Sequence, residues 1–470
     1  MEQRAPLVVR TADDVIDIVN SGVLKPRRAV LVTVVALGSI FVDGWDLGSF
    51  GLGTVQITSS FHLGTGNWGF DSLPFLSAAI LLGAIIGGLA GGYYTDRIGR
   101  MRMFLIDLLL LVVATILCAF APNPELFWLF RLLMGIGVGL DVPVALAFIA
   151  EYSAITSKGR NVNIAQVMST GASAIAFFAM IPFHELGVGN SLWRYAIGLG
   201  AVPAVIVLAL RFVYAAESPM WAAKHDSVDA AVAILRRNYD MDVRYEPSAQ
   251  PAAATKVHNA LAQLGTLFRR PYLIRTVLTS ILVVTQAVEF YAISLYTPKI
   301  LTALFGSNIV LVLVLSGTAN VIGVFGALGC VISTQRLGLR RLALIGYAVT
   351  CACLAVISGS YPLLAAPVAT VLIMIFYAGH NYGPGYAGTA MGTLSYPTSI
   401  RGISGGYTQA ITRVGGIIGA YAFPVLVAAQ GIRFTIGAIA FAPLIGIIAV
   451  LLIRWDPVGK NVELTGPATT

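Results

Sequence analysis

Two carboxylates, Asp43 and Asp46, lie in the stretch FVDGWDLGSFG (residues 41–51), inside an apolar run that extends from about Ala29 to Ile57. An ionised side chain at the centre of a membrane-spanning helix costs at least about 2.5–3.5 kcal/mol on insertion scales, and such acids mark ion pathways and proton relays. Asp43 precedes Asp46 by three residues, which can place both on one face of a helix. The pattern therefore marks both acids as candidate functional residues within the membrane.

A second polar patch, HNYGPG (residues 380–385), interrupts another apolar run and is broken by glycines. We expect this patch to face a cavity, so Asn381 and Tyr382 are candidate solute ligands. Imidazole titrates near neutral pH, which makes His380 a candidate proton carrier. A hydrogen-bonded interior histidine is the alternative.

The composition indicates the elements that must position these residues. Of the 470 residues, 57% are hydrophobic and only 11% are charged, against about 25% in soluble domains. The net charge of +8 does not indicate nucleic acid, because the basic residues cluster between apolar runs. The four cysteines lie within those runs at spacings that suit no disulfide framework or metal site. No cofactor is therefore expected.

Twelve apolar runs are each long enough to cross a bilayer as a helix. They cover residues 29–57, 71–94, 102–121, 125–150, 163–186, 194–214, 273–304, 308–333, 341–359, 361–393, 403–429 and 433–454. Basic residues concentrate in alternate loops, which is the pattern of cytoplasmic loops, and this predicts that both termini are cytoplasmic. The fold class is therefore an all-α polytopic membrane protein.

One long polar connection divides the runs six and six. The predicted units are a cytoplasmic N-terminal segment (1–28), a six-helix bundle (29–215), a central cytoplasmic loop with short helices (216–272), a second six-helix bundle (273–454) and a disordered cytoplasmic tail (455–470). TDRIGRMR after the second run is echoed by TQRLGLRR after the eighth. A duplicated six-helix unit is typical of secondary transporters, which bind solute between their halves. TADDVIDIVNSGVL near the N-terminus begins like a capping box and predicts a further short helix.

The loop GGYYTDRIGR (91–100) resembles the signature of the major facilitator superfamily. The resemblance implies two pseudo-symmetric six-helix bundles and a cytoplasmic latch that closes the inner gate. The alternative for these charges is ordinary positive-inside topology. The residues assigned to the latch are Gly92, Asp96, Arg97, Arg100, Glu151, Arg160 and Arg401.

Other stretches are similar to the sugar porters and their metabolite-transporting relatives within that superfamily. They are RLLMGIGVGL (131–140), AFIAE (147–151), WRYAIGLGAVPA (193–204), ESPMW (217–221), GPG (383–385) and YPTSIRG (396–402). The resemblance covers nearly the whole chain. It implies a membrane transporter, not an enzyme, that works as a monomer in a bacterial-type inner membrane.

In proton-coupled sugar porters the first span carries a Gly-aromatic-Asp element and the fourth begins with an Arg. Here these positions hold Asp46 and Arg131, so the resemblance implies that the two face each other and that Asp46 exchanges a proton. A static ion pair is the alternative. Asp141 stands where phosphate:proton symporters carry an acid, which implies a proton or cation site; an interior carboxylate satisfied by its neighbours is the alternative.

The same resemblance supplies candidate solute ligands. Gln166 matches a solute-contacting Gln of the fifth span. TQAVEFYAISLYTP (285–298) aligns with the seventh span of sugar porters and supplies Gln286, Glu289, Tyr291 and Tyr296. Gln and Tyr suit a neutral polar solute, because they form hydrogen bonds without a buried charge. Glu289 replaces a glycine and is expected to alter specificity or to face the gate.

Arg413 interrupts the eleventh apolar run, where an unpaired guanidinium is costly. Organic-anion carriers use a similarly placed Arg for a carboxylate. The alternative is pairing with a buried acid, for which the candidates are Asp43, Asp141 and Glu289.

The function expected is symport of a small polar organic solute with protons, across a lipid bilayer, by alternating access. A sugar-like or polyol-like solute is favoured. The rivals are an organic-anion carrier on the same fold, a uniporter, and a transporter-like receptor. The receptor is disfavoured because it would carry a large extra cytoplasmic domain. A plain sugar carrier is put in doubt by Thr389 and Leu394, which stand where sugar porters have a Trp and an acid.

Overall fold

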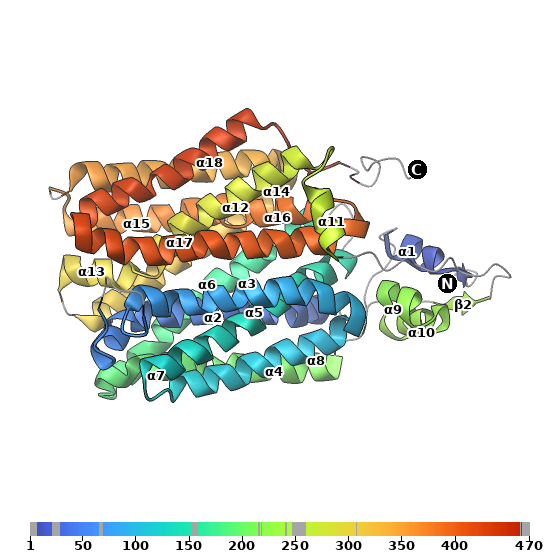
Figure 1. Cartoon of the computed structure of the whole chain (residues 1–470), viewed down its shortest axis with the longest axis horizontal. Coiled ribbons are helices and arrows are strands. Elements are labelled where there is room, and N and C mark those ends of the chain that lie inside the picture. The colour runs from blue at the N-terminus through green and yellow to red at the C-terminus, as the bar shows by residue number, and fades with distance from the viewer. Residues whose placement is uncertain are drawn as a thin grey trace.

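The computed structural model forms an elongated helical bundle with a small α/β unit at one end (Figure 1). It describes residues 7–20, 29–64, 69–152, 158–214, 217, 219–239, 242–246, 260–306, 308–361, 363–460 and 462. The long helices run along the bundle axis, and Figure 1 shows those of the C-terminal half above those of the N-terminal half.

In the described part of the N-terminal half, seven α-helices occupy the first six predicted runs. They are α2 (Ala29–Ser60), α3 (Leu73–Ile98), α4 (Arg100–Ala119), α5 (Pro124–Tyr152), α6 (Lys158–Glu185), α7 (Leu192–Leu199) and α8 (Ala201–Tyr214). The short 3-10 helix η1 (Gly189–Ser191) precedes α7. Helices α7 and α8 together fill the sixth run and are separated at Gly200.

The C-terminal half occupies the other six predicted runs. Its helices are α12 (Leu273–Ser294), α13 (Thr297–Phe305), α14 (Ile309–Ser360), α15 (Ala366–Tyr382), α16 (Pro384–Leu394), α17 (Thr398–Ile439) and α18 (Phe441–Leu452). Helix α14 holds two runs joined at Gly338 (φ 77°), and α17 breaks at Gly431 (φ 78°). Only glycine adopts such positive φ values without strain, which is why the chain turns at these residues. All twelve predicted runs are therefore helical.

Membrane-spanning character follows from length and composition. Within the described residues, seven helical stretches are long and apolar enough to cross a membrane. The two longest, Ile309–Ser360 and Ile400–Leu452, each contain two of the predicted runs. Between the halves, α6 packs along α14 and α3 packs along α17. These two seams flank the region where the candidate site lies.

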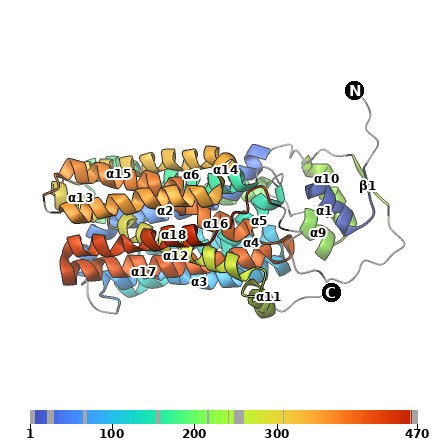
Figure 2. The ribbon, with the colours of Figure 1, turned by 90° about the horizontal axis from the view of Figure 1, so that it is seen from above.

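A small α/β unit lies at one end of the bundle (Figure 2). It contains the first described residues of the chain. It combines β1 (Leu7–Val9), α1 (Ala12–Asn20), α9 (Pro219–His225), α10 (Val228–Tyr239) and β2 (Val243–Tyr245). The two strands pair in parallel, with Leu7 opposite Val243. The unit has its own buried apolar core, which includes Val9, Val15, Val232 and Leu235. The following helix α11 (Ala260–Leu267) packs against α17 instead.

The capping box predicted at the start of α1 is present. The backbone N–H of Asp14 donates to the Thr11 hydroxyl at 3.3 Å, and the Asp14 carboxylate accepts the N–H of Thr11 at 2.8 Å. The backbone N–H groups of Arg10 and then Thr11 lower the pKa of Asp14, because they stabilise its ionised form.

The segment after α18 differs from the expected disordered tail. Trp455 donates its indole N–H to Ser395 at 2.8 Å, and the guanidinium of Arg275 lies 4.0 Å above its ring. Asp456 accepts the backbone N–H of Arg340 at 2.9 Å. The expectation is therefore wrong for residues 455–460, because an aromatic ring stacked on a cation and a carboxylate at a helix break hold them against the bundle.

The predicted latch is described only in part. The structure describes the backbone but not the side chains of Gly92, Asp96, Arg97, Arg100, Glu151 and Arg160, which lie in or between helices α3 to α6. Arg401 is described, and its guanidinium donates to the carbonyl of Tyr396 at 3.3 Å. The gating role of these residues stays a prediction.

Candidate functional site

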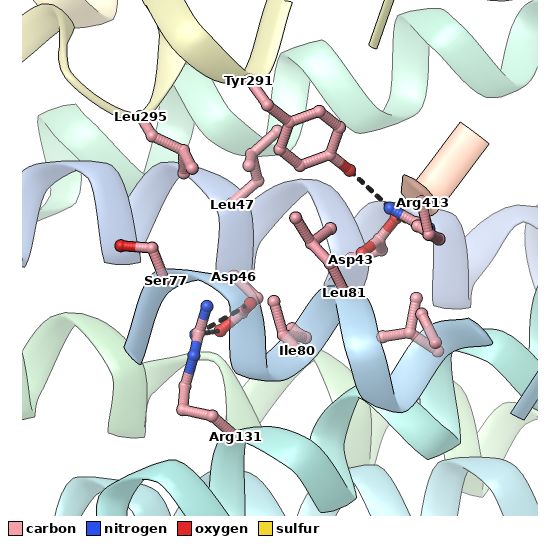
Figure 3. Close-up of a pocket in the computed structure, with 12 residues that line it drawn as sticks. Asp43, Asp46, Leu47, Ser77, Ile80, Leu81, Arg131, Tyr291, Leu295 and Arg413 are labelled. Carbon is pink, nitrogen blue, oxygen red and sulfur yellow. Dashed lines mark hydrogen bonds and ion pairs between the residues drawn. The ribbon is translucent and has the colours of Figure 1, made fainter. Parts of the chain in front are cut away.

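The candidate site is a small cavity between the two halves, where α2, α3 and α5 face α12 and α17 (Figure 3). Its volume of about 20 Å³ has room for about one water molecule. Four of its lining residues carry formal charges: Asp43, Asp46, Arg131 and Arg413. These charges sum to zero. The cavity is polar at its centre and is otherwise lined mainly by aliphatic side chains.

Asp46 and Arg131 form the innermost pair of the cavity. Nη1 of Arg131 donates to both carboxylate oxygens of Asp46, at 2.8 and 3.0 Å. Both side chains are more than 90% buried. The guanidinium also lies 4.3 Å from the ring centre of Phe50, so an aromatic ring covers that face of it. The structure thus places the two residues as the sequence resemblance implied.

A second charged pair joins the two halves of the chain. Nη2 of Arg413, on α17, lies 3.4 Å from Asp43 on α2, and its Nη1 donates to the hydroxyl of Tyr291 on α12 (Figure 3). About a quarter of the Asp43 side chain remains exposed, against 9% of Arg413. Of the three acids considered as partners for Arg413, Asp43 is the one that contacts it.

An uncharged polar contact also crosses between the halves, outside this cavity. Gln166 and Thr170 on α6 both donate to the side-chain oxygen of Asn381 on α15, Thr170 at 2.7 Å. Asn381 in turn donates to the carbonyl of Tyr377 on its own helix. Gln166 and Asn381, predicted separately, are thus brought together, and Thr170 was missed. Tyr382 lies half-buried with its ring against Gly329.

Three further predicted ligands are not among the residues that line the cavity. Gln286 is buried and donates to the carbonyl of Val283 on its own helix at 3.3 Å. Tyr296 donates to the carbonyl of Ala420 at 2.7 Å and stacks on Phe423. These contacts occupy Nε2 of Gln286 and the hydroxyl of Tyr296 within the helix packing, so a solute role for these two groups requires a rearrangement.

Glu289 is the third predicted ligand outside the cavity. It is fully buried in the C-terminal half, 3.0 Å from Nδ1 of His380, and it accepts the hydroxyl of Thr350 at 3.0 Å. The imidazole stacks on Phe290 at 4.3 Å between ring centres. His380 therefore has the interior hydrogen bond that was the alternative to a proton-carrying role. The sequence analysis did not identify Thr350 as a partner of Glu289.

Asp141 has a partner that the sequence analysis also missed. It lies 2.8 Å from Arg211 on α8, which also lies 3.3 Å from Asp107 on α4. Asp107 interrupts the apolar run FLIDLLLLVV in the same way that Asp46 interrupts its own run, so the signal was present. Arg211 lies close to the end of its apolar run, where a basic residue is usually interpreted as part of a cytoplasmic loop rather than as a buried partner.

Comparison with known proteins agrees with this architecture. The profile of the family described as "Sugar (and other) transporter" matches residues 31–464. The inner membrane metabolite transport protein YgcS of Escherichia coli is 26% identical over 440 residues, which is 92% of each chain. Inositol transporter 4 of Arabidopsis thaliana is 29% identical over 295 residues, covering 59% of this chain and 49% of that protein.

Solved structures are similar in fold. The proton:xylose symporter XylE, bound to 6-bromo-6-deoxy-D-glucose, superposes with a TM-score of 0.75 at 19% identity, covering 93% of this chain and 98% of that one. The partially occluded inward-open form of the xylose transporter XylE from E. coli gives the same TM-score at 18% identity, covering 92% and 99%. With its twelve helical runs in two halves and a family match over most of its length, the chain belongs to the sugar (and other) transporter family of the major facilitator superfamily.

Proposed function

We propose that this protein is a symporter that moves a small, neutral, polar organic solute together with protons across a bacterial-type inner membrane. The observation that carries the proposal is the buried Asp46–Arg131 pair in the cavity between the halves. An acid that is buried at the solute path can be neutral in one state and ionised in another, and this is the requirement for coupling. Both termini would be cytoplasmic and the monomer would be the working unit.

The pair suggests how protons and solute share the path. Arg131 donates to both oxygens of Asp46, and an opposite charge in contact favours the ionised form of the acid. When one side of the cavity opens, water separates the two groups, and Asp46 can then take a proton. A neutral Asp46 releases Arg131 to donate to a solute hydroxyl. Closure over solute and proton would then carry both across.

The solute class follows from the uncharged polar groups that lie between the two halves. The charges of Asp43, Asp46, Arg131 and Arg413 balance one another at rest, and Arg413 is held by Asp43 rather than left for a solute carboxylate. Amide and hydroxyl groups at Gln166, Thr170 and Asn381 donate to and accept from neutral hydroxyls. Polyhydroxylated solutes fit this chemistry. The relatives named for xylose and inositol act on solutes of that kind.

The test is a solute panel on purified protein in proteoliposomes, with a pH dye trapped inside. Sugars, cyclic polyols and small carboxylates are each added outside under an inward proton gradient. We expect one or more neutral polyols or sugars to acidify the interior as they enter. Solute entry without a pH change would establish a uniporter and overturn the coupling part of the proposal.

Replacement of Asn381 by Ala is expected to raise KM for the solute about tenfold with little change in kcat. The side-chain oxygen of Asn381 accepts hydrogen bonds from Gln166 and Thr170 across the two halves. Loss of this side chain would remove the hydrogen bond proposed between it and the solute, which is worth about 1–1.5 kcal/mol. Initial uptake rates over a range of solute concentrations measure the change. Asn320→Ala is the matched control, because this buried amide donates within its own helix, to Ser316. Equal KM values for the two variants would remove Asn381 from the solute site.

An organic-anion carrier is the second candidate, and Arg413 is the residue that decides it. Arg413 already contacts Asp43 and Tyr291, so an incoming carboxylate would have to displace Asp43. For a neutral solute, Arg413→Gln is expected to lower uptake at least tenfold by leaving Asp43 without its cation, and Asp43→Asn/Arg413→Gln to restore most of it. For an anion, the double variant would stay as inactive as the single one. Uptake of the active solute by the three proteins separates the cases.

A further inference from the structure

Three ionisable side chains meet inside the N-terminal half, apart from the cavity already described. Arg211 on α8 lies 2.8 Å from Asp141 on α5 and 3.3 Å from Asp107 on α4. All three are almost fully buried, with 2% or less of each residue exposed. The two acids thus share one guanidinium in the interior of a four-helix contact that α2 completes through Ser39.

The charges of this group do not balance. Arg211 contributes one positive charge and the two acids would contribute two negative charges if both were ionised. Arg211 also makes contacts with neutral groups: the Ser39 hydroxyl at 2.6 Å, the carbonyl of Phe104 at 3.2 Å and the Phe104 ring at 3.9 Å. The opposite half presents Tyr386 on α16, close enough to interact electrostatically with Asp141, and a neutral phenol supplies no positive charge. Among the described side chains, a second ionised carboxylate would therefore be buried without a cation of its own, which is costly.

The hydrogen bonds point to the same deficit. Oδ2 of Asp107 and both carboxylate oxygens of Asp141 are buried without a hydrogen-bond donor among the described residues. Oδ1 of Asp141 is close to Arg211, yet no N–H of the guanidinium is aligned with it. Oδ1 of each acid lies against the same Nη1 atom of Arg211, at 3.3 and 2.8 Å, so the two carboxyl groups are neighbours. A hydrogen bond between two carboxyl groups requires that one of them carry a proton.

We propose that Asp107 and Asp141 share one bound proton beneath Arg211, forming a proton-binding site of the N-terminal half that is separate from the Asp46–Arg131 pair. One proton removes the excess charge and supplies the missing donor at the same time. Neighbouring acids that share a proton in this way titrate as a pair. The proposal concerns the resting protein and does not depend on solute coupling.

The position of the site relates it to the solute path. Asp107 is the eighth residue of α4, and Arg211 lies three residues before the end of α8, so both lie within about 10 Å of the end that carries the α/β unit. Ser39 precedes Asp46 by seven residues on α2, which is about 10 Å along the helix. The shared proton therefore lies between that end of the bundle and the central cavity.

The proposal is tested by infrared difference spectroscopy on purified, lipid-reconstituted protein near neutral pH. The C=O stretch of a protonated carboxyl group is absent from a carboxylate, so the spectrum counts bound protons directly. Wild type minus Asp107→Asn, and wild type minus Asp141→Asn, are each expected to show one lost protonated-carboxyl band. Each variant retains one acid for Arg211, so the remaining acid is balanced and ionised.

The single variants are also expected to fold, because each is electrically neutral at this site. Asp226→Asn, an exposed acid of the α/β unit, is the control and should lose no such band. Gel filtration in detergent confirms folding before spectra are compared. If only one variant folds, its spectrum alone tests the proposal, because either substitution removes the shared proton. Persistence of the band in a folded Asp107→Asn or Asp141→Asn protein would overturn the proposal, because both acids would then be ionised in wild type.

Discussion

Replacement of Asp46 by Asn is expected to abolish proton-driven accumulation of solute while leaving solute exchange across the membrane. One proton moving down one pH unit releases about 1.4 kcal/mol, enough for about tenfold accumulation in one-to-one symport. An amide at position 46 cannot carry a proton, so the inside-to-outside ratio at one pH unit should fall from about ten to about one. Proteoliposomes with a set pH gradient measure the ratio, and counterflow of labelled solute measures exchange.

A loss of activity alone would not distinguish coupling from structure, because the same pair holds α2 against α5. Removing one partner of a buried ion pair costs about 3–5 kcal/mol, since the other charge is left uncompensated. The double variant Asp46→Asn/Arg131→Gln removes both charges and should recover the stability. If the pair is only structural, this double variant would also recover accumulation. If Asp46 carries the proton, the double variant would be stable and would exchange solute without accumulating it.

The helices of this protein could be predicted closely from the sequence, since each membrane-spanning helix must satisfy its own backbone in lipid and so appears as an apolar run. The breaks within α14 and α17 fall at Gly338 and Gly431, between predicted runs. The parallel pairing of β1 with β2 could not be predicted. Each strand has only three residues, and the partners are separated by more than half of the chain.

The charged pairs could be predicted only where a resemblance supplied both members. Asp46 and Arg131 were paired through family motifs, and the structure places them in contact. Asp141 was identified without its partners. Which residues meet depends on the rotation of each helix about its axis, and an apolar run that is hydrophobic on all sides carries little information on that rotation.

The seventh span shows the same limit in the C-terminal half. An ungapped alignment supplied Gln286, Glu289, Tyr291 and Tyr296 as solute ligands, but only Tyr291 lines the cavity. Glu289 replaces a glycine, and its partner His380 comes from a different span. An alignment identifies a position along a helix, and the neighbours available to the new side chain decide where it hydrogen-bonds.

The second large effect is expected at the contact between α3 and α5, where Gly135→Val should prevent accumulation of folded protein. A Cβ atom at residue 135 would overlap the backbone carbonyl of Ile80, and one at Gly83 would overlap that of Leu132. Small residues allow two helix backbones to touch in a membrane, and the GxGxG stretch has that role here. An overpacked side chain usually costs about 1–3 kcal/mol. The cost here is expected to be higher, because a backbone carbonyl cannot escape by changing rotamer.

The matched control is Gly405→Val on α17, where a Cβ atom would meet nothing within 4 Å. Both substitutions put the same side chain into a buried glycine position of a long helix, so they differ chiefly in the space available. Fluorescence-detected gel filtration of a tagged protein measures the yield of folded protein and the midpoint temperature of its thermal unfolding. We expect a near-normal peak for Gly405→Val and a loss of at least tenfold for Gly135→Val. Because α5 also carries Arg131 and Asp141, a normal yield for Gly135→Val would mean that α5 can move away from α3. Asp46 and Arg131 would then not be held at the separation on which the proposed coupling depends.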